Sequence, residues 1–552
     1  MASNTTPSIV DYIIVGGGTA GLVVASRLSE DPQTQVLVLE SGSNISTDPR
    51  VQDVNGWLGL LGSDLDWNFK TIPQPGMNGR EYAHGAGKAL GGTSAINGMA
   101  FTPPAPAGID GWAKLGNPRW TWTSLVPYLR KSYTITCPDP SICSDIAVDE
   151  KSSASGPIQV TYPALEKKKN HVLIQAWNNA FKEMGFDYTG GDILAEEKTI
   201  GSRPYTASID PNSGYRSSAD VEYGALASKR GNVTITTEAT VLRVLFSSSE
   251  SENWVATGVD VLVNGQTATI QAAKEVILAA GTFNTPKLLE LSGIGDKDRL
   301  TGLGIPVVID NPGVGENLQN HLMSLYPVSL NSHPDLEGIT PGIYAIALIR
   351  LDPDEQEKLL NQHISSPRKP HEKAIQSIIE QPNEASALLY LWVMPGNGCV
   401  LGMIPCFPFS RGSTHISSAD PNAKPITDPR FFSHDLDIEI MARHAQTLHN
   451  LPSAPALQPY FQQGSRATDL EATKKFLREE GAEMAHHACG TAPMLPREDG
   501  GVVDQDLKVY ETENVRVVDA SVFPLISSAN PMATMYAVAE RAADLIREFE
   551  DV

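Results

Sequence analysis

The sequence predicts an α/β protein whose first domain is interrupted by an inserted α+β domain, an antiparallel sheet with helices. An apolar strand, a glycine-rich turn and a helix follow one another at 12–28, and a strand and helix of the same character return at 514–548. Between them, 321–480 has charged helical segments and strands bounded by Pro- and Asn-rich turns. We therefore expect the two ends of the chain to complete one sheet around the insertion.

Length and charge restrict the possible partners. The chain has 552 residues, enough for two or more domains, and a net charge of −22 from 42 Lys and Arg against 64 Asp and Glu. This balance disfavours nucleic acid or an anionic membrane as a partner. No apolar run approaches the ~18 residues of a membrane span. Residues 1–10 have neither a basic start nor an apolar core, so we expect no signal peptide and a cytoplasmic protein.

The five cysteines favour a reduced, intracellular setting, because they are few and odd in number. Alternatively, Cys137 and Cys143 pair within one Pro-rich loop. No spacing of cysteines and histidines resembles a metal site, so no metal is expected.

The first element is a strand–turn–helix unit. The apolar run Tyr12–Val15 predicts a buried strand, and Gly16, Gly18 and Gly21 fit the G-x-G-x-x-G spacing before an apolar helix at 22–28. Gly16 would form the tight turn, Gly18 would let a pyrophosphate approach the backbone, and Gly21 would let helix and strand pack. The helix N-terminus would then offer its unpaired N–H groups to the phosphates.

A second strand, Gln35–Leu39, ends in Glu40 about 20 residues after the glycines, where an acceptor for a ribose hydroxyl is expected. A glycine-rich turn alone is usually only a turn. Strand, glycines, helix, strand and acid in this order predict dinucleotide binding by a Rossmann-like domain.

The glycine-rich stretch 85–100 predicts backbone that approaches a flat or phosphorylated ligand. An ordinary flexible loop is the alternative, but the polar side chains of Thr93, Ser94 and Asn97 favour the ligand.

Regular elements are expected along the rest of the chain. A loop-rich excursion covers 41–80, and helices are predicted at 173–184, from 214 and at 284–295, the last one started by Pro286. Strands at 232–237, 240–246, 255–263 and 267–272 are expected to form one small sheet, and 275–281 a separate buried strand. At the C-terminal end, the strand 514–519 precedes a helix at 531–548, with Asn530 as its cap.

Four segments in order resemble the glucose–methanol–choline (GMC) family of flavoprotein oxidoreductases, over nearly the whole chain. They are 16–40, GKALGGTSAING at 87–98, GTFNTPKLLELSGIG at 281–295, and HACGTAPM at 487–494 followed by 519–532. The resemblance implies FAD and the oxidation of an alcohol or related donor. It implies an FAD-binding core over 7–330 with excursions at 43–84 and 156–214, a substrate-binding domain mainly over 331–480, and a return to the FAD-binding domain over 481–552.

The resemblance also implies site residues. The expected FAD contacts are Gly16, Gly18, Thr19, Ala20, Gly21, Glu40, Thr93, Asn97, Gly98, Met99, Ala100, Val241, Asp519 and Ala520. The catalytic base falls on His487 and its partner on Asn530, with His486 as a packing or substrate-lining residue. Members with covalently linked FAD place a histidine where Ile96 stands, so non-covalent FAD is expected. The other ten histidines receive no catalytic role.

The expected chemistry is removal of a hydroxyl proton by His487 while FAD accepts a hydride. Asn530 cannot act as a base but can hydrogen-bond the alcohol oxygen. The acceptor of the electrons is expected to be O2 or another acceptor, the protein a monomer or homodimer, and the substrate a small organic alcohol, by analogy with members in specialised metabolism. The alternative is a non-redox member that keeps FAD and catalyses a cyclase, lyase or decarboxylase reaction.

Overall fold

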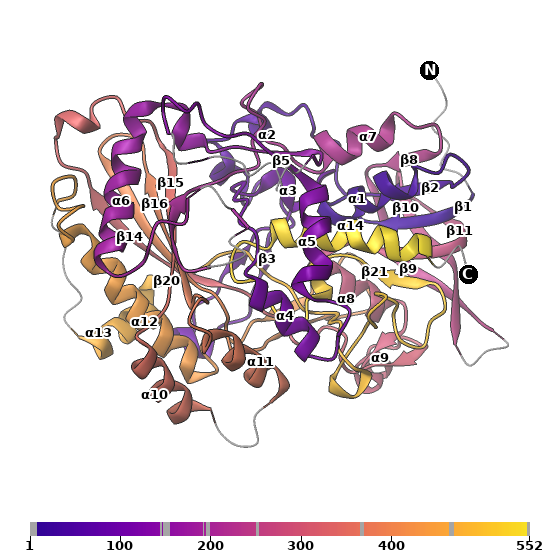
Figure 1. The fold of residues 1–552 in the computed structure, drawn as a ribbon. Helices are drawn as coiled ribbons and strands as arrows, with labels where there is room; N and C mark the ends of the chain where they lie inside the picture. The colour runs from indigo at the N-terminus through magenta and orange to yellow at the C-terminus, as the bar shows by residue number, and fades with distance from the viewer. Residues whose placement is uncertain are drawn as a thin grey trace.

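The molecule has two large sheets, one at each end of the view in Figure 1. The structure, a computed structural model, describes residues 8–143, 146, 155–190, 193–194, 199–249, 253–364, 369–462 and 469–548. Residues 1–7, on which the expectation of no leader partly rests, lie outside this description. None of the described helices combines the length and apolar character that crossing a bilayer would require.

The first sheet has seven strands in the order β8-β2-β1-β11-β10-β9, with β21 beside β11. Five strands are parallel and β9 and β10 are antiparallel. The strands are β1 (Ile9–Val15), β2 (Val36–Leu39), β8 (Val233–Thr236), β9 (Ala239–Ser248), β10 (Trp254–Val263), β11 (Gln266–Leu278) and β21 (Val515–Val517). The C-terminal strand β21 therefore joins the N-terminal sheet, as the apolar segments at both ends of the chain predict.

The strand β11 corrects two sequence-based expectations. Residues 267–272 and 275–281 were expected to be separate strands, but β11 runs unbroken over Gln266–Leu278. Its first half pairs with β10 and its second half with β1 and β21. The hairpin of β9 and β10 is thus an extension of the seven-stranded sheet and not a small sheet of its own.

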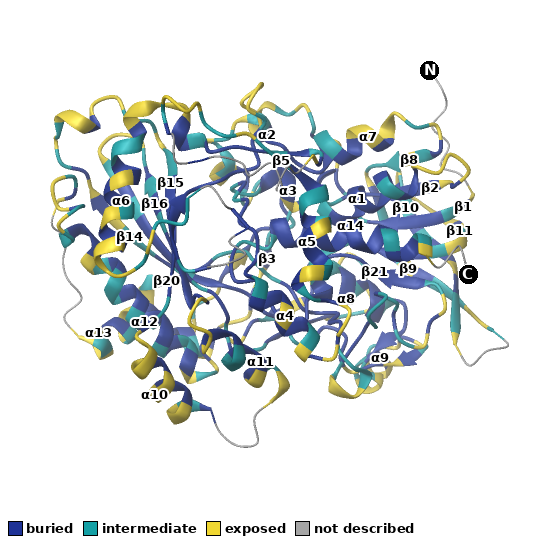
Figure 2. Cartoon of the chain, in the orientation of Figure 1, coloured by how far each residue is buried: buried dark blue, intermediate teal, exposed yellow. Residues whose placement is uncertain are grey.

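The helices α1 (Thr19–Leu28) and α14 (Met532–Glu548) pack together against this sheet, and α5 (Trp122–Ser132) packs on α14. Figure 2 shows α14 as almost entirely buried. Glu540 on α14 is fully buried, and its carboxylate accepts hydrogen bonds from Arg27 at 2.7 Å and from the Tyr223 hydroxyl at 2.6 Å. A buried carboxylate requires such partners, so this contact fixes α14 on α1.

The helix α8 (Gly281–Leu291) begins earlier than predicted and contains Pro286 in its interior. Proline has no N–H for the carbonyl four residues before it, which here belongs to Thr282. The hydroxyl of Thr491 donates to that carbonyl at 2.6 Å instead. The HACGTAPM segment is thereby joined to the helix that follows β11.

The second sheet has six antiparallel strands in the order β20-β14-β17-β16-β15-β7. They are β7 (Gly201–Pro204), β14 (Leu322–Ser329), β15 (Gly342–Ile349), β16 (Ala387–Val393), β17 (Gly398–Pro405) and β20 (Ala482–Met484). The helix α6 (His171–Glu183) packs on β7 and β15, and α12 (Asp435–Asn450) packs on β17. The segment 201–204 from the predicted excursion contributes the edge strand β7.

Shorter elements complete the chain. The helices are α2 (Pro49–Gln52), α3 (Thr93–Ile96), α4 (Pro106–Lys114), α7 (Ala225–Ser228), α9 (Lys297–Gly302), α10 (Pro353–His363), α11 (Pro370–Ile379) and α13 (Leu470–Phe476). The paired short strands are β3 (Phe69–Lys70) with β4 (Ala83–His84), β5 (Tyr133–Ile135) with β6 (Ile158–Val160), β12 (Ile294–Gly295) with β13 (Ile309–Asp310), and β18 (Ser413–His415) with β19 (Ile426–Asp428). The helix expected from 214 starts as a π-helical turn at Asp220–Gly224.

Candidate active site

A cavity of about 710 Å³ lies between the two sheets and is lined by residues from both. Every site residue that the sequence predicts lines this cavity except Gly21. These residues are Gly16, Gly18, Thr19, Ala20, Glu40, Thr93, Asn97, Gly98, Met99, Ala100, Val241, His487, Asp519, Ala520 and Asn530. Segments more than 500 residues apart in the chain therefore converge on one space.

The main chain forms the wall at the carboxyl end of β1. Gly16 has a φ of +108°, and a Cβ there would lie 2.3 Å from the carbonyl oxygen of Ala279. The helix α1 then begins at Thr19 without a side-chain cap at Gly18, and the residues of this end, Gly18 to Ala20, line the cavity. The N–H groups of an uncapped first turn are available to a ligand. Gly21 lies behind this wall, where a Cβ would meet the carbonyl oxygen of Gly16 at 2.0 Å. Its role is the packing of helix on strand.

Glu40 is a buried carboxyl at the end of β2. Its oxygens accept hydrogen bonds from the N–H of Gly42 at 2.7 Å and of Gly17 at 2.9 Å. Burial raises the pKa of Glu40 to about 7, although these two N–H groups favour the charged form. The carboxyl is thus held by the glycine turn itself, and it lines the cavity with lone pairs left to accept further hydrogen bonds.

The glycine-rich stretch 85–100 crosses the glycine turn. The N–H of Gly91 donates to the carbonyl of Gly17 at 2.8 Å, and the N–H of Gly87 donates to the hydroxyl of Thr93 at 3.2 Å. Farther along, the side-chain oxygen of Asn97 accepts from the N–H of Met99 at 2.9 Å. These hydrogen bonds join the stretch to the glycine turn, and its residues 85–88, 92–94 and 96–100 line the cavity.

The carboxyl of Asp519 joins two elements rather than standing free in the cavity. It accepts from the hydroxyl of Thr285 at 2.5 Å, the N–H of Gly281 at 2.9 Å and the N–H of Ser521 at 2.8 Å. Burial raises its pKa against the effect of these donors. The side chain therefore fixes the start of α8 beside the end of β21, while its residue still lines the cavity.

His487 is half-buried at the cavity and has three polar partners. Its Nε2 lies 3.0 Å from the side-chain nitrogen of Asn530, and its Nδ1 lies 3.0 Å from Nδ1 of His321. Its N–H donates to the side-chain oxygen of Asn320 at 2.8 Å. The other nitrogen of His321, Nε2, lies 2.8 Å from the carbonyl oxygen of Cys406. His321, which immediately precedes β14, was given no role from the sequence.

This chain of contacts assigns the ring protons of both histidines. A carbonyl only accepts, so Nε2 of His321 carries a proton and its Nδ1 is an acceptor in the neutral ring. His487 must then donate from Nδ1, which leaves a lone pair on its Nε2. Burial lowers the pKa of His321 to about 4, and burial with the neighbouring rings of His321, His486 and His84 keeps the pKa of His487 well below its ordinary value. Both rings are neutral at pH 7.

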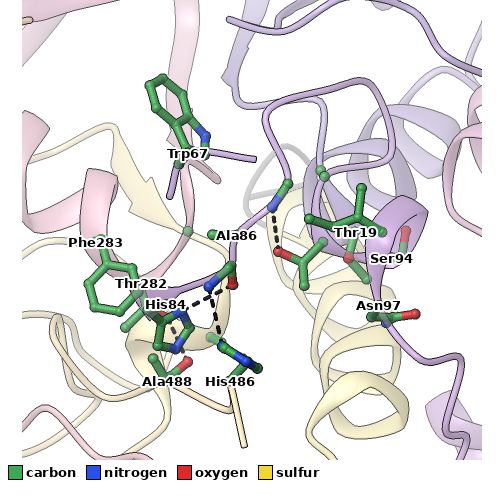
Figure 3. Close-up of a pocket in the computed structure, with 18 of the residues that line it drawn as sticks. Thr19, Trp67, His84, Ala86, Ser94, Asn97, Thr282, Phe283, His486 and Ala488 are labelled. Atoms are coloured by element: carbon green, nitrogen blue, oxygen red, sulfur yellow. Dashed lines mark hydrogen bonds between the residues drawn. The ribbon is translucent and has the colours of Figure 1, made fainter. Parts of the chain in front are cut away.

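Two further histidines line the cavity beside this pair. Nδ1 of His486 accepts from the N–H of Gly85 at 3.2 Å, and its ring meets that of His84 edge-on at 5.2 Å. Figure 3 shows both rings on the same side of the pocket as Phe283, opposite Asn97. His84 was missed from the sequence because its only local signal is a position at the start of the glycine-rich stretch.

Comparisons with known proteins agree with this architecture. Two family models described as GMC oxidoreductase match residues 10–323 and 408–539. The GMC oxidoreductase family protein Mala s 12 from Malassezia sympodialis is 33% identical, over 97% of this chain and 92% of its own. An FAD-dependent oxidoreductase from Chaetomium thermophilum superposes with a TM-score of 0.87 at 28% identity, over 98% of this chain and 100% of its own. A fungal aryl-alcohol oxidase superposes with a TM-score of 0.84 at 27% identity, over 99% and 100%.

Proposed function

The chain belongs to the GMC oxidoreductase family of FAD-dependent enzymes, and on this premise we propose that it oxidises a primary or secondary alcohol of a small organic molecule. One observation carries the proposal: the lone pair on Nε2 of His487 accepts from the amide of Asn530 at 3.0 Å, and both residues line the cavity, so an alcohol hydroxyl entering there can replace that amide as the partner of Nε2. A neutral imidazole is the side chain best suited to take a hydroxyl proton near neutral pH.

The residues around the cavity suit FAD. The first turn of α1 would hold its phosphates, Glu40 would accept from its ribose, and the stretch around Asn97 and Gly98 would lie along its ring system. When bound, FAD would supply the acceptor for the hydride that leaves the alcohol carbon. We propose that it is held without a covalent bond, because Ile96, at the position of the linking histidine in other members, has no nucleophilic atom.

His321 would hold His487 in the tautomer that can act as a base. Because its own proton is committed to the Cys406 carbonyl, it can only accept from Nδ1 of His487. His487 is thereby held with Nε2 unprotonated and directed at the cavity. When Nε2 takes the hydroxyl proton, the ring becomes charged, and the hydrogen bond from Nδ1 to His321 then becomes a stronger, charge-assisted one.

Asn530 would position the alcohol. Its amide N–H contacts Nε2 of His487 at 3.0 Å, so it can donate to an alcohol oxygen placed at the same point. The helix α14 begins two residues later, at Met532. Pro531 and Met532 both line the cavity, and the N-terminal end of α14 would stabilise negative charge there by about 0.3–2 kcal/mol.

The test is an anaerobic titration of the FAD-bound protein with alcohols, followed by flavin absorbance. We expect the absorbance to bleach in proportion to the aldehyde or ketone formed. Conversion of a substrate while the flavin stays oxidised would contradict the proposal and favour the cyclase, lyase or decarboxylase alternative. Addition of oxygen with a peroxide assay then separates an oxidase from a dehydrogenase that uses another acceptor.

A further inference from the structure

The wall of the cavity opposite the glycine turn is formed by alternate residues of the six-stranded sheet. Along β16, Leu388, Tyr390 and Trp392 share one face and line the cavity, and Met323 and Leu325 do the same along β14. Side chains at alternate positions of a strand point to the same side. This face of the sheet is therefore the surface that a substrate meets.

Four aromatic side chains line this part of the cavity, two from β16 and two from the segments beside the predicted flavin-binding stretch. Trp57 and Trp392 stack with their centroids 6.1 Å apart and their planes at 27°. Trp57 lies against Gly98, where a Cβ would be 3.3 Å from its indole ring. The Tyr205 hydroxyl donates to the carbonyl of Gly98 at 3.2 Å. We call Trp57, Tyr205, Tyr390 and Trp392 the aromatic wall.

One glycine of the six-stranded sheet, Gly402, leaves the space that a ring of the aromatic wall occupies. Gly402 on β17 is opposite both Tyr390 and Leu325 in the sheet. A Cβ on Gly402 would lie 1.9 Å from the ring of Tyr390, so only glycine lets that ring lie across the sheet. The Tyr390 hydroxyl then reaches toward the sulfur of Met323 at 3.9 Å. The ring of Tyr390 thus passes over Gly402 on the face of the sheet that lines the cavity.

The aromatic wall is electrically neutral. Among the described residues, no Asp, Glu, Lys or Arg of the six-stranded sheet lines the cavity. Burial raises the pKa of both Tyr205 and Tyr390, so their hydroxyls stay uncharged. A carboxylate or ammonium group seated against this wall would lose hydration without gaining a charged partner from it, which is unfavourable. The charged side chains that line the cavity, among them Asp66, Lys88, Lys287 and Lys424, belong to other segments.

From this neutral aromatic surface beside the base we infer that the enzyme acts on an uncharged aromatic alcohol, whose ring stacks on the aromatic wall while its hydroxyl meets His487. Flat rings gain from offset or edge-on contacts with Trp and Tyr beyond the area they bury. This inference rests on the proposed function, since it names the substrate class of the same site.

The test compares matched alcohols on the FAD-bound enzyme, with dissociation constants read from perturbation of the flavin spectrum. Benzyl alcohol should bind roughly threefold to tenfold more tightly than cyclohexylmethanol, which has the same size but no aromatic ring. 4-(Hydroxymethyl)benzamide should bind at least tenfold more tightly than 4-(hydroxymethyl)benzoate, its charged isostere. Equal or reversed affinities within both pairs would overturn the inference.

The variant Trp392→Leu keeps an apolar wall but removes one aromatic face. It should remove most of the preference for benzyl alcohol over cyclohexylmethanol while FAD content is unchanged. Phe476→Leu, at an exposed ring on α13 away from the cavity, is the matched control and should keep the preference. An unchanged preference in Trp392→Leu would contradict the inference. If no alcohol reduces the flavin, the proposed function fails, while the order of affinities still decides the inference.

Discussion

The two ends of the cavity are lined by different groups, mostly main chain at one end and side chains at the other. At the seven-stranded sheet the wall is mostly main chain, from Gly16, Gly18 and the first turn of α1, with the buried carboxyl of Glu40. At the six-stranded sheet the wall is made of side chains such as Tyr390 and Trp392. Main-chain walls tolerate almost no substitution, whereas the side chains of a strand can change without altering the sheet. The first end is suited to a constant ligand and the second to a substrate that differs among relatives.

His487 lies where these two ends of the cavity meet. Of the variants that test the comparison, the one without His487 should have the largest effect. In His487→Ala the limiting rate of flavin reduction by an alcohol should fall by about 10²–10⁴, the usual contribution of a general base. FAD content should stay the same, because the binding end is untouched. His363→Ala, on α10, is the control for the loss of a histidine. Undiminished reduction in His487→Ala would reject it as the base.

The role of His321 predicts a smaller effect with a distinct signature. His321→Ala should lower the limiting rate by roughly 10- to 100-fold, because the base is no longer oriented. Burial lowers the pKa of His487 most, while His321, neutral with a pKa of about 4, accepts a hydrogen bond that favours the charged ring of His487. Removing His321 should therefore lower the pKa of His487 further. The acid limb of the pH profile of kcat/KM should therefore move to lower pH.

A rescue variant separates positioning by His321 from simple packing. In His321→Gln the amide can donate to the Cys406 carbonyl and accept from His487, as the imidazole does. This variant should recover most of the rate that His321→Ala loses. A pH profile that stays in place in His321→Ala, or no recovery in His321→Gln, would assign His321 a merely structural role.

Glu40, at the end of the cavity beside the seven-stranded sheet, predicts that the affinity for FAD depends on pH. The protein without FAD holds a proton on this carboxyl up to about pH 7, above the ordinary pKa of glutamate. Only the ionised carboxylate accepts from both ribose hydroxyls, so protonation competes with FAD below pH 7. The affinity for FAD should thus rise by up to about tenfold from pH 6 to pH 8 and level off above. Glu40→Gln should bind more weakly without this rise, and an identical rise in that variant would exclude Glu40 as its source.

The end of the cavity at the seven-stranded sheet could be predicted because the residues that shape it are close together in the sequence. The turn at Gly16, the packing of Gly21 and the position of Glu40 all follow from residues within one strand–helix–strand unit. The packing of α14 in the first domain could be predicted because one face of this helix is apolar. Asn530 was expected to cap α14 or to meet the substrate, and its side chain contacts His487 at 3.0 Å.

The end of the cavity at the six-stranded sheet could not be predicted, because it is formed by segments that are far apart in the sequence. The contact of His321 with His487 spans 166 residues, and nothing beside His321 in the sequence marks it. Alternation along β16 is visible in the sequence and groups Tyr390 with Trp392. Which face of that strand meets the cavity is decided only by the register with β15 and β17.

The most direct test of the account is anaerobic single-turnover reduction of the flavin by benzyl alcohol in two variants. His487→Ala should lower the limiting rate and leave the dissociation constant of the alcohol near that of the wild type. Trp392→Leu should raise that dissociation constant and leave the limiting rate largely unchanged. If both variants change the same parameter, or if His487→Ala is reduced at the wild-type rate, the division of the cavity into a base at the junction and an aromatic wall for the substrate is wrong.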